Sequence, residues 1–276
     1  MKITAKTKIC MIIGDPVEYS LSPQIHNAGY EALGIDGEYI YVASHTKKDE
    51  LENFIKGVRA MQIRGIAVKT PHKTAVMEYL DEIDAVAKQI GAVNTIVNDD
   101  GKLKGYNTDW IGVTKPLEII SPIKNKMTAL IGAGGAARAA AYGITIKGSK
   151  LTIFNRTLSG AQELANEFGG AAKSLEDLEE IKNMDIIINA TSVGHPPHEN
   201  ETPVPSDYIK STHIVYDIVY GSNAPTKLIA EASKKGAKTI TGIEMLLHQG
   251  FAQFKLFTGH DAPEEAMRNV LLQNVK

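Results

Sequence analysis

Short apolar runs alternate with segments of helical periodicity along most of the chain. In the first 108 residues the apolar runs predict strands at Lys8 to Ile13, Glu38 to Ala43 and Gly65 to Val68. A helical pattern from Leu51 to Met61 lies between the second and the third. Strands that alternate with helices predict an α/β layer with a mostly parallel sheet.

Cap and turn signals add detail to this region. Ser22 followed by Pro23 predicts the N-cap and first residue of a helix, and Gly34 is suited to the helix end. The run Asn98-Asp99-Asp100-Gly101 predicts a hairpin turn, and we expect this hairpin to close the sheet of the first domain. Its two strands are expected at Ala92 to Val97 and Lys102 to Tyr106.

A helix is expected to lead from this region into a second one. Asn107-Thr108-Asp109 is typical of a helix cap, and Pro116 is expected to kink or shorten the helix that follows. The alternation then continues with strands at Asp185 to Asn189, His213 to Ile218 and Lys238 to Ile240. The last helix is predicted from Met245 to Phe257, and it should end at Gly259.

The stretch from Met127 to Thr157 has the most specific pattern in the chain. A buried strand, Ala129 to Ile131, runs into Gly132-Ala133-Gly134-Gly135, and an alanine-rich helical segment follows at once. Unpaired N–H groups and the dipole at a helix N-terminus favour an anion, and glycines let the backbone approach a pyrophosphate. A second strand, Lys150 to Phe154, delivers Asn155-Arg156-Thr157 to the expected place of an adenosine ribose. The stretch therefore predicts a Rossmann-like dinucleotide site.

Arg156 bears on the identity of the dinucleotide. NAD sites usually place an acidic residue after the second strand, whereas a guanidinium offers charge to the 2′-phosphate of NADP. The alternative is a solvated cation at the end of a strand.

These elements predict two α/β domains with a cleft between them. Residues 1–108 form the first domain in this prediction. Residues 109–243 form the Rossmann-like domain that binds NADP.

Composition narrows the class of partner. The 276 residues are 43% hydrophobic and 22% charged, with a formal net charge of −2, which argues against a sequence-independent nucleic-acid binder. Cys10 is the only cysteine and lies in an apolar run, so we expect a buried thiol and no internal disulfide. Since neither a membrane span nor a signal peptide is apparent, we expect a cytoplasmic protein. The sequence leaves a monomer and a homodimer equally open.

Three polar residues near strand ends of the first domain are candidates for chemistry. Hydride transfer needs a substrate held against the nicotinamide and a group that exchanges the accompanying proton. Lys73 and Asp109 can exchange a proton with an alcohol or ketone oxygen, while Asn94 hydrogen-bonds a neighbouring hydroxyl. Taken singly, Lys73 also fits a solvated lysine and Asp109 a helix cap.

Several longer segments resemble, in order, the signatures of the shikimate dehydrogenase family, which contains shikimate and quinate dehydrogenases. In the first half they are Gly14-Asp15-Pro16 with Ser20-Leu21-Ser22-Pro23-Gln24-Ile25-His26-Asn27, Val68 to Lys73, Gly91-Ala92-Val93-Asn94-Thr95 and Gly105-Tyr106-Asn107-Thr108-Asp109. In the second half they are Gly132-Ala133-Gly134-Gly135-Ala136, Asn155-Arg156-Thr157, Asn189-Ala190-Thr191-Ser192, Tyr216-Asp217-Ile218-Val219-Tyr220 and Gly242-Ile243-Glu244-Met245 with Gln249. The resemblance covers nearly the whole length. It implies that residues 1–108, completed by 244–276, form the substrate-binding domain, and that the final helix packs back on this domain.

The resemblance implies reversible NADP-dependent oxidation of shikimate to 3-dehydroshikimate, a step of aromatic amino-acid biosynthesis. It makes Lys73 and Asp109 the catalytic pair and leaves open which of them takes the proton. The substrate residues that it implies are Ser20, Ser22, Asn94, Asp109, Tyr220 and Gln249, to which we add Lys69. The cofactor residues that it implies are Gly132, Ala133, Gly134, Gly135, Ala136, Asn155, Arg156, Thr157, Thr191, Val219, Gly242 and Met245. No metal is expected.

The chain departs from the family pattern at several positions. Ala67 and Lys69 stand where the family usually has Asn and then Thr or Ser, and both alternate onto one strand face. Lys69 either pairs with a substrate carboxylate or points to solvent. Gly160 replaces a second basic residue that often follows the Asn-Arg-Thr run, so we expect a modest NADP preference. His195 replaces a common methionine. A quinate or related polyol-acid dehydrogenase and a non-catalytic ligand sensor therefore remain alternatives.

Overall fold

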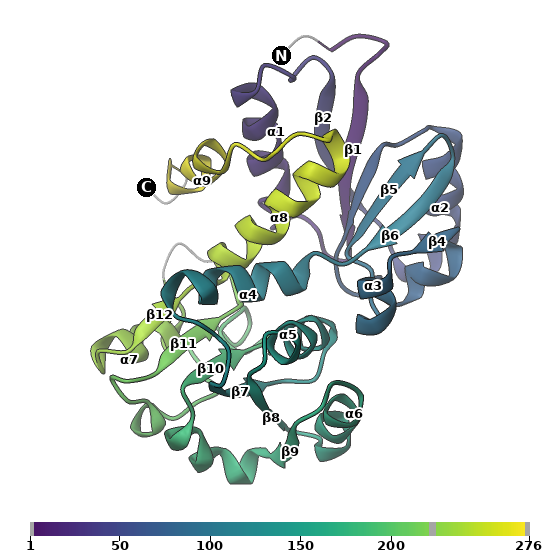
Figure 1. Cartoon of the computed structure of the whole chain (residues 1–276). Coiled ribbons are helices and arrows are strands. Elements are labelled where there is room, and N and C mark those ends of the chain that lie inside the picture. Colours follow the sequence, from purple (N-terminus) through teal and green to yellow (C-terminus); the bar gives the residue numbers. More distant parts are fainter. Residues whose placement is uncertain (1–2, 221–224, 274–276) are drawn as a thin grey trace. The chain divides into compact units, whose positions relative to one another are not determined.

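A computed structural model of the chain describes residues 3–220 and 225–273 (Figure 1). The chain divides into two compact units. Unit 1 contains residues 1–108 and 247–276, and unit 2 contains residues 109–246. Helix α8 (Gly242–Thr258) begins in unit 2 and continues into unit 1. None of the described helices is long and apolar enough to cross a membrane.

In the described part of unit 1, six strands form one sheet in the order β2-β1-β3-β5-β6-β4. The first three strands along the chain are parallel, and β5 pairs with its neighbours antiparallel. The strands are β1 (Lys8–Gly14), β2 (Tyr39–His45), β3 (Gly65–Val68), β4 (Glu82–Ile83), β5 (Thr95–Asp99) and β6 (Lys102–Tyr106). The helices are α1 (Ser22–Ala32), α2 (Leu51–Ala60), α3 (Ala85–Ile90), α9 (Glu264–Gln273) and the 3-10 turns η1 (Lys48–Glu50) and η2 (Ala75–Tyr79).

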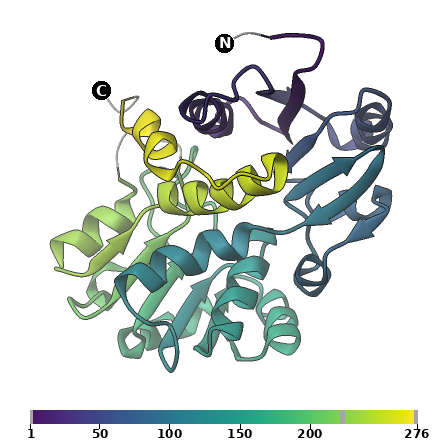
Figure 2. The ribbon, with the colours of Figure 1, turned by 45° about the horizontal axis from the view of Figure 1, so that its top comes forward.

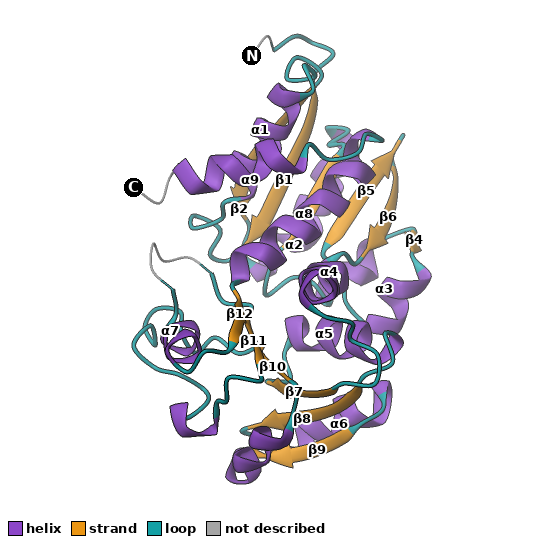
Figure 3. Ribbon diagram, turned by 60° about the vertical axis from the view of Figure 1, so that its left-hand side comes forward, coloured by secondary structure: helices purple, strands orange, loops and turns teal. Residues whose placement is uncertain are grey.

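Both faces of this sheet are covered, as expected for an α/β layer (Figure 3). On one face, aliphatic side chains of α2 such as Ile55 pack with Ile66 and Ile96 of the sheet. On the other face, aromatic side chains of α8 pack against α1 and β2. The ring of Phe257 lies so close to β3 that a Cβ on Gly65 would stand 2.3 Å from it. Helix α9 lies beside α1 (Figure 1 and Figure 2).

His26 lies at the centre of this aromatic cluster. Its ring stacks on Tyr41 at 4.3 Å between centroids and is also close to Phe254 and Phe257. The side chain is fully buried, and burial lowers the pKa of His26 from its ordinary value of 6.5 to about 3. The ring is therefore neutral in the folded protein at neutral pH.

The low pKa of His26 predicts a loss of stability in mild acid. Below pH 6.5 the unfolded chain gains a proton at this residue, whereas the folded chain gains it only near pH 3, so acid favours unfolding. Between 6.5 and about pH 5, His26 should lower the free energy of unfolding by about 2 kcal/mol. Denaturant titrations at several pH values measure this. His26→Phe should reduce the dependence of the free energy of unfolding on pH. His260→Gln, which replaces an exposed ring, should leave that dependence unchanged. Equal slopes for wild type and His26→Phe would contradict the assignment.

The predicted cap at Ser22 is wrong by one residue. Helix α1 already includes Ser22, and the N-cap is Leu21, whose side chain has no hydrogen-bonding group. The hydroxyl of Ser20 accepts a hydrogen bond of 3.3 Å from the N–H of Ser22, which provides a cap from two residues upstream. The predicted helix end is confirmed, because Gly34 follows the helix with φ of 70°.

The hairpin is confirmed, but it does not close the sheet. Asp100 and Gly101 both have positive φ, 52° and 89°, as a two-residue hairpin turn requires. The first strand begins at Thr95, three residues later than predicted from the apolar run. Strand β4 pairs with β6 and forms the edge. It consists of Glu82 and Ile83 alone, which is too short for an alternating pattern.

Unit 2 confirms the Rossmann-like prediction. Its described strands form a parallel sheet in the order β12-β11-β10-β7-β8-β9. The strands are β7 (Met127–Ile131), β8 (Lys150–Asn155), β9 (Ala171–Ser174), β10 (Ile186–Asn189), β11 (Ile214–Asp217) and β12 (Lys238–Ile240). The helices are α4 (Asp109–Ile120), α5 (Gly135–Ile146), α6 (Leu158–Phe168), α7 (Lys227–Lys234) and the 3-10 segments η3 (Leu175–Asn183) and η4 (Ser206–Tyr208). The edge strand β9 was not predicted.

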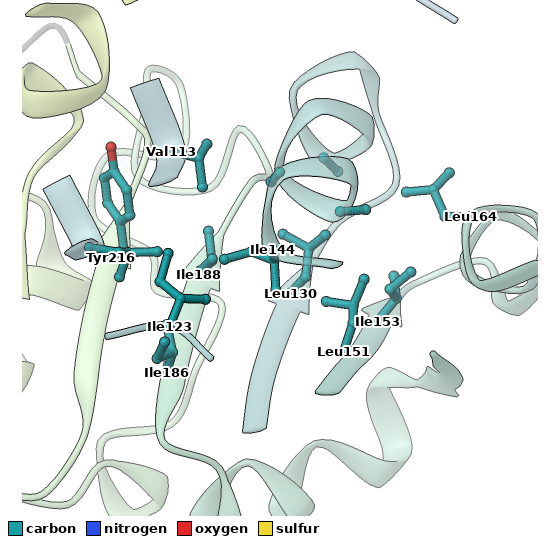
Figure 4. Close-up of a cluster of buried hydrophobic side chains, with 14 of the residues drawn as sticks. Val113, Ile123, Leu130, Ile144, Leu151, Ile153, Leu164, Ile186, Ile188 and Tyr216 are labelled. Atoms are coloured by element: carbon teal, nitrogen blue, oxygen red, sulfur yellow. The ribbon is translucent and has the colours of Figure 1, made fainter. Parts of the chain in front are cut away.

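Helices α4, α5 and α6 cover one face of this sheet (Figure 4). Val113, Ile144 and Leu164 of these helices pack on Leu130 and Ile188 of the strands. The opposite face is covered by η3 and α7. The chain order reverses at β7, since β8 lies on one side of it and β10 on the other. The loop after β7 therefore lies at the switch point, where sheets of this type bind ligands.

Of the two effects predicted for Pro116, a kink or a shorter helix, α4 does not show the shortening. The helix continues through it to Ile120. Proline lacks the N–H that would pair with the carbonyl of Gly112 four residues earlier. The hydroxyl of Tyr216 donates to that carbonyl at 2.7 Å instead, from a fully buried side chain. Burial also raises the pKa of Tyr216, so the hydroxyl keeps its proton.

Tyr216→Phe should therefore lower the free energy of unfolding by about 1–3 kcal/mol, because it leaves a buried carbonyl without its donor. Denaturant unfolding measures the loss. In a Pro116→Ala background the new N–H can pair with Gly112, so the same substitution should cost less. Equal costs in the two backgrounds would contradict this role for Tyr216.

The end of the chain contains one more helix than predicted. The helix predicted from Met245 to Phe257 is α8, which is longer by three residues at its start and one at its end. It stops before Gly259, which has φ of 81°, as expected. Helix α9 then follows, and its buried side chains include Met267 and Leu271.

Candidate active site

The candidate substrate residues of unit 1 lie around the carboxyl ends of β1 and β3. Ser20 and Ser22 belong to the loop and first helical turn that follow β1, and Ser22 is 2% exposed. Lys69 follows β3 directly, and its N–H donates to the carbonyl of Ile13 in β1. Parallel strands that end side by side thus bring these side chains to one edge of the sheet.

Lys69 does not extend freely into solvent. Its side chain is half-buried, and its aliphatic part lies along the backbone of Gly14, where a Cβ would stand 3.0 Å from Lys69 Cβ. Burial lowers the pKa of Lys69, the charge of Lys73 lowers it further, and Glu18 opposes both. The ammonium group is therefore within electrostatic reach of the candidate catalytic lysine. Ala67, the other departure from the family pattern, is buried in β3.

Asn94 is held at the start of β5, next to the end of β3. Its carbonyl accepts a hydrogen bond of 2.7 Å from the N–H of Val68. Its side-chain oxygen accepts from the N–H of Thr108 at 2.8 Å and from the hydroxyl of Thr95 at 2.7 Å. Its side-chain nitrogen donates to the hydroxyl of Thr108 at 2.9 Å. Because a backbone N–H can only donate, these contacts fix which side-chain atom is the oxygen.

Lys73 and Gln249 complete the candidates of unit 1. The carbonyl of Lys73 accepts a hydrogen bond of 2.8 Å from Val93, just before Asn94, and the side chain is half-buried. Gln249 is 9% exposed on α8. Lys69, Lys73 and Asn94 are thus gathered by β3 and the segments next to it.

The glycine-rich loop of unit 2 has the geometry that a phosphate requires. Gly132 has φ of 108°, and a Cβ on it would stand 2.9 Å from the carbonyl oxygen of Ala190. Gly134 is the N-cap of α5 and Gly135 its first residue, and both are exposed. Apart from the chain neighbours and the nearby backbone of the helix itself, no heavy atom of the described residues comes within 4 Å of a Cβ built on either glycine. An anion can therefore approach the unpaired N–H groups of this first turn.

The Asn155-Arg156-Thr157 segment lies beside this loop. Gly132 donates its N–H to the carbonyl of Phe154 at 2.8 Å, so the ends of β7 and β8 are side by side. The side chain of Asn155 donates to the carbonyl of Thr157 at 2.9 Å and closes the turn. Arg156 is exposed and forms no ion pair with any residue in the described ranges. Its guanidinium is thus available to a phosphate.

Thr191 and Val219 are held at the ends of β10 and β11 by one buried pair. Asn189 accepts hydrogen bonds from the N–H and the hydroxyl of Thr191, and its own side chain donates to Asp217 at 2.9 Å. Asp217 accepts in addition from the N–H of Val219 at 3.1 Å. Burial raises the pKa of Asp217, although these hydrogen bonds oppose the shift.

The other candidates of unit 2 lie nearby in sequence or space. Gly242 is close to Val219, because a Cβ on it would stand 2.4 Å from the carbonyl oxygen of that residue. Met245 is buried in the core of the unit. Asp109 opens α4 and is 4% exposed. Burial raises the pKa of Tyr220 to about 12, and the charge of Asp109 adds to the shift, so these two groups are neighbours.

Sequence reasoning missed the residues that hold Asn94. Thr95 and Thr108 lie within the family motifs but were not among the predicted site residues. Gln253 lies outside the motifs. Gln253 is 2% exposed and donates to the carbonyl of Asn94 at 3.2 Å and to the hydroxyl of Thr95 at 2.9 Å. One signal was present: Gln253 follows Gln249 by four residues, which places both on one helix face.

Comparisons with known proteins show the family to which the chain belongs. Family models match residues 12–96 (shikimate dehydrogenase substrate binding domain), 116–224 (shikimate/quinate 5-dehydrogenase) and 242–272 (shikimate 5′-dehydrogenase C-terminal domain). The NADP(+) shikimate dehydrogenase of Bacillus cereus is 42% identical over 272 residues, which cover 96% of this chain and 97% of that one. That of Methanococcus maripaludis is also 42% identical, with 98% of each chain covered.

Solved structures give the same result. A shikimate dehydrogenase crystallised with NADP+ superimposes with a TM-score of 0.93 at 41% identity, covering 99% of this chain and 98% of that one. The Thermus thermophilus enzyme in complex with NADP(H) and shikimate has a TM-score of 0.90 at 34% identity, covering 97% and 99%. The ligand-free 5-ketofructose reductase of a Gluconobacter strain has a TM-score of 0.85 at 28% identity, and the match covers 98% of this chain and 100% of that one. The chain therefore belongs to the shikimate dehydrogenase family.

Proposed function

We propose that this protein is an NADP-dependent shikimate dehydrogenase, which interconverts shikimate with NADP+ and 3-dehydroshikimate with NADPH in aromatic amino-acid biosynthesis. One observation carries the proposal. The same chain has a side-chain-free, exposed helix start beside Arg156 in unit 2 and a gathered set of Lys69, Lys73 and Asn94 in unit 1. Unit 2 is the NADP-binding domain in this proposal, and unit 1 the substrate-binding domain.

The residues of unit 2 fit the cofactor. The first turn of α5 would hold the pyrophosphate, with Ala133 and Ala136 beside the glycines of the loop. Arg156 would pair with the 2′-phosphate, flanked by Asn155 and Thr157. Thr191, Val219, Gly242 and Met245 would line the nicotinamide end. When bound, NADP+ supplies a hydride acceptor.

The residues of the substrate site would orient the alcohol and move its proton. Ser20 and Ser22 would hold the carboxylate, and Asn94, Tyr220 and Gln249 the hydroxyl groups. Oxidation removes a hydride from the carbinol carbon and a proton from its oxygen. Lys73 or Asp109 takes that proton, and the pair returns it when the ketone is reduced.

The test of this proposal is a panel of cyclic acids. Purified protein is mixed with shikimate or quinate and with NADP+ or NAD+, and cofactor reduction is followed by absorbance. Turnover of shikimate with NADP+ at the highest kcat/KM is the expected result. Binding of shikimate by calorimetry without any turnover would instead indicate a ligand sensor that has kept the fold.

Lys69 favours a second candidate, a quinate or related polyol-acid dehydrogenase. A cation beside Lys73 where the family usually has Thr or Ser changes the polar contacts offered to the substrate ring. A protein of similar fold is a 5-ketofructose reductase, so this fold is not confined to shikimate as a substrate. A higher kcat/KM for quinate than for shikimate in the panel would favour this candidate.

We also propose that the protein acts in the cytoplasm as a monomer or a homodimer and binds no nucleic acid. The net charge of −2 supports the lack of a nucleic-acid partner. The single, buried and free Cys10 supports the location in the cytoplasm. Sedimentation velocity distinguishes the two assembly states.

A further inference from the structure

We infer that Gln253 is a positioning residue for the substrate, which acts by fixing the side chain of Asn94. This inference rests on the proposed function, in which Asn94 hydrogen-bonds a substrate hydroxyl. Gln253 belongs to α8, whereas Asn94 lies 159 residues earlier, at the start of β5. The contact thus joins the returning end of the chain to the substrate site.

The contacts of Gln253 leave Asn94 little freedom. The side-chain nitrogen of Gln253 donates to the carbonyl oxygen of Asn94 at 3.2 Å, and the N–H of Val68 donates to the same oxygen at 2.7 Å. Both lone pairs of that carbonyl are therefore used. The backbone of Asn94 is held between the end of β3 and α8.

Thr95 carries the effect to the side chain. Its hydroxyl accepts from Gln253 at 2.9 Å and donates to the side-chain oxygen of Asn94 at 2.7 Å. A hydroxyl has one proton, and the donor from Gln253 directs it toward Asn94. Thr108 holds the other edge of the amide through its N–H and its hydroxyl. The amide of Asn94 is thus pre-oriented before any substrate arrives.

The network also reaches the catalytic pair through the chain. Thr108 is followed directly by Asp109, so a displacement of Asn94 releases the residue before the candidate proton acceptor. All four members of the network are at most 5% exposed, so water replaces lost contacts poorly. A substitution at Gln253 should therefore weaken the hydrogen bond between Asn94 and the substrate hydroxyl.

The experiment compares Gln253→Leu with wild type in steady-state oxidation of shikimate. Leu keeps much of the volume and removes both donors, so the KM for shikimate should rise by roughly tenfold. The KM for NADP+ should not change. Phe254→Leu, at the adjacent buried residue of α8, is the matched control and should lower the melting temperature without changing either KM.

A second pair of variants guards against misfolding of Gln253→Leu. Thr95→Val removes the hydroxyl at constant shape and should raise the KM for shikimate, whereas Thr95→Ser should keep the wild-type value. The double variant Gln253→Leu with Thr95→Val should resemble either single one, because each breaks the same chain of contacts.

The outcomes separate the inference from the function on which it rests. An unchanged KM for shikimate in Gln253→Leu or in Thr95→Val would overturn the inference, and so would an equal rise in Phe254→Leu. Either result leaves wild-type turnover intact. Wild-type protein that turns over neither shikimate nor quinate would refute the proposed function, and the inference with it.

Discussion

Lys73→Ala should lower the kcat for shikimate oxidation by about a thousandfold, because it removes a group that exchanges the substrate proton. Lys73 is half-buried and lies where β3, Lys69 and Asn94 come together, which is the position expected for a group that touches the substrate oxygen. Steady-state kinetics with NADP+ measures the loss. The KM for shikimate should change much less than kcat, since other residues hold the carboxylate and the ring hydroxyls.

Lys69→Ala is the matched control, because it removes a half-buried lysine from the same segment. It should change the KM for shikimate and leave kcat largely intact. Asp109→Asn should lower kcat in the same way as Lys73→Ala, and the double variant should be little slower than either single one if the two groups act as a unit. A Lys73→Ala protein with near wild-type kcat would exclude the role given to Lys73.

Arg156→Asp should reverse the preference between the two nicotinamide cofactors. The exposed guanidinium beside the glycine-rich loop offers a charged hydrogen bond to a 2′-phosphate, and a carboxylate there repels the phosphate and accepts from the 2′-hydroxyl of NAD+. The kcat/KM for NADP+ should fall by about a hundredfold, and that for NAD+ should rise. Steady-state kinetics with each cofactor at saturating shikimate gives both values.

Lys150→Asp makes the same charge change at the opposite end of β8 and serves as the control. It should leave the cofactor preference unchanged, since the site lies at the carboxyl end of the strand. Arg156→Gln should give an intermediate preference, because the charge is lost but not reversed. Parallel losses for NADP+ and NAD+ in Arg156→Asp would show that Arg156 supports the fold and not the choice of cofactor.

Much of the fold could be predicted because most of its strands coincide with apolar runs and its helices are long enough for a pattern to appear. The parallel strands of both sheets follow from apolar runs, and the loop at Gly132 follows from the glycines after one of these runs. The elements that were missed are short or at an edge. Strand β4 has two residues and β9 has four, of which Ala171 is exposed. Their pairing is decided by the neighbouring strand and not by their own side chains.

Local rules also failed where a residue outside the motif supplied a contact. Pro116 is tolerated inside α4 because Tyr216, about a hundred residues later, donates to the carbonyl that the proline leaves unpaired. Ser22 is not the cap because it already belongs to α1, and the hydroxyl of Ser20 accepts its N–H. In each case the sequence indicated a helix backbone group that lacks a partner within the helix, and only the structure identified the side chain that binds it.

The candidate site divides in the same way. A phosphate loop is made from consecutive backbone groups, so Gly132 to Gly135 could be found from their order alone. The support of Asn94 comes from Thr95, Thr108 and Gln253, which no single segment contains. The motifs could thus identify Asn94, the residue proposed to contact the substrate, but not the residues that orient its side chain.

Unit 1 is made of two pieces of the chain that are separated in sequence, and this affects the order in which the two units can fold during synthesis. Phe254 and Phe257, which surround His26, and Met267, which contacts the α1 segment at Gly29, lie beyond unit 2 in the chain. A ribosome that has made the first 108 residues has not yet made these side chains. Unit 2 is continuous, so it can fold as soon as it emerges. The part of the protein that is synthesised first is therefore completed last.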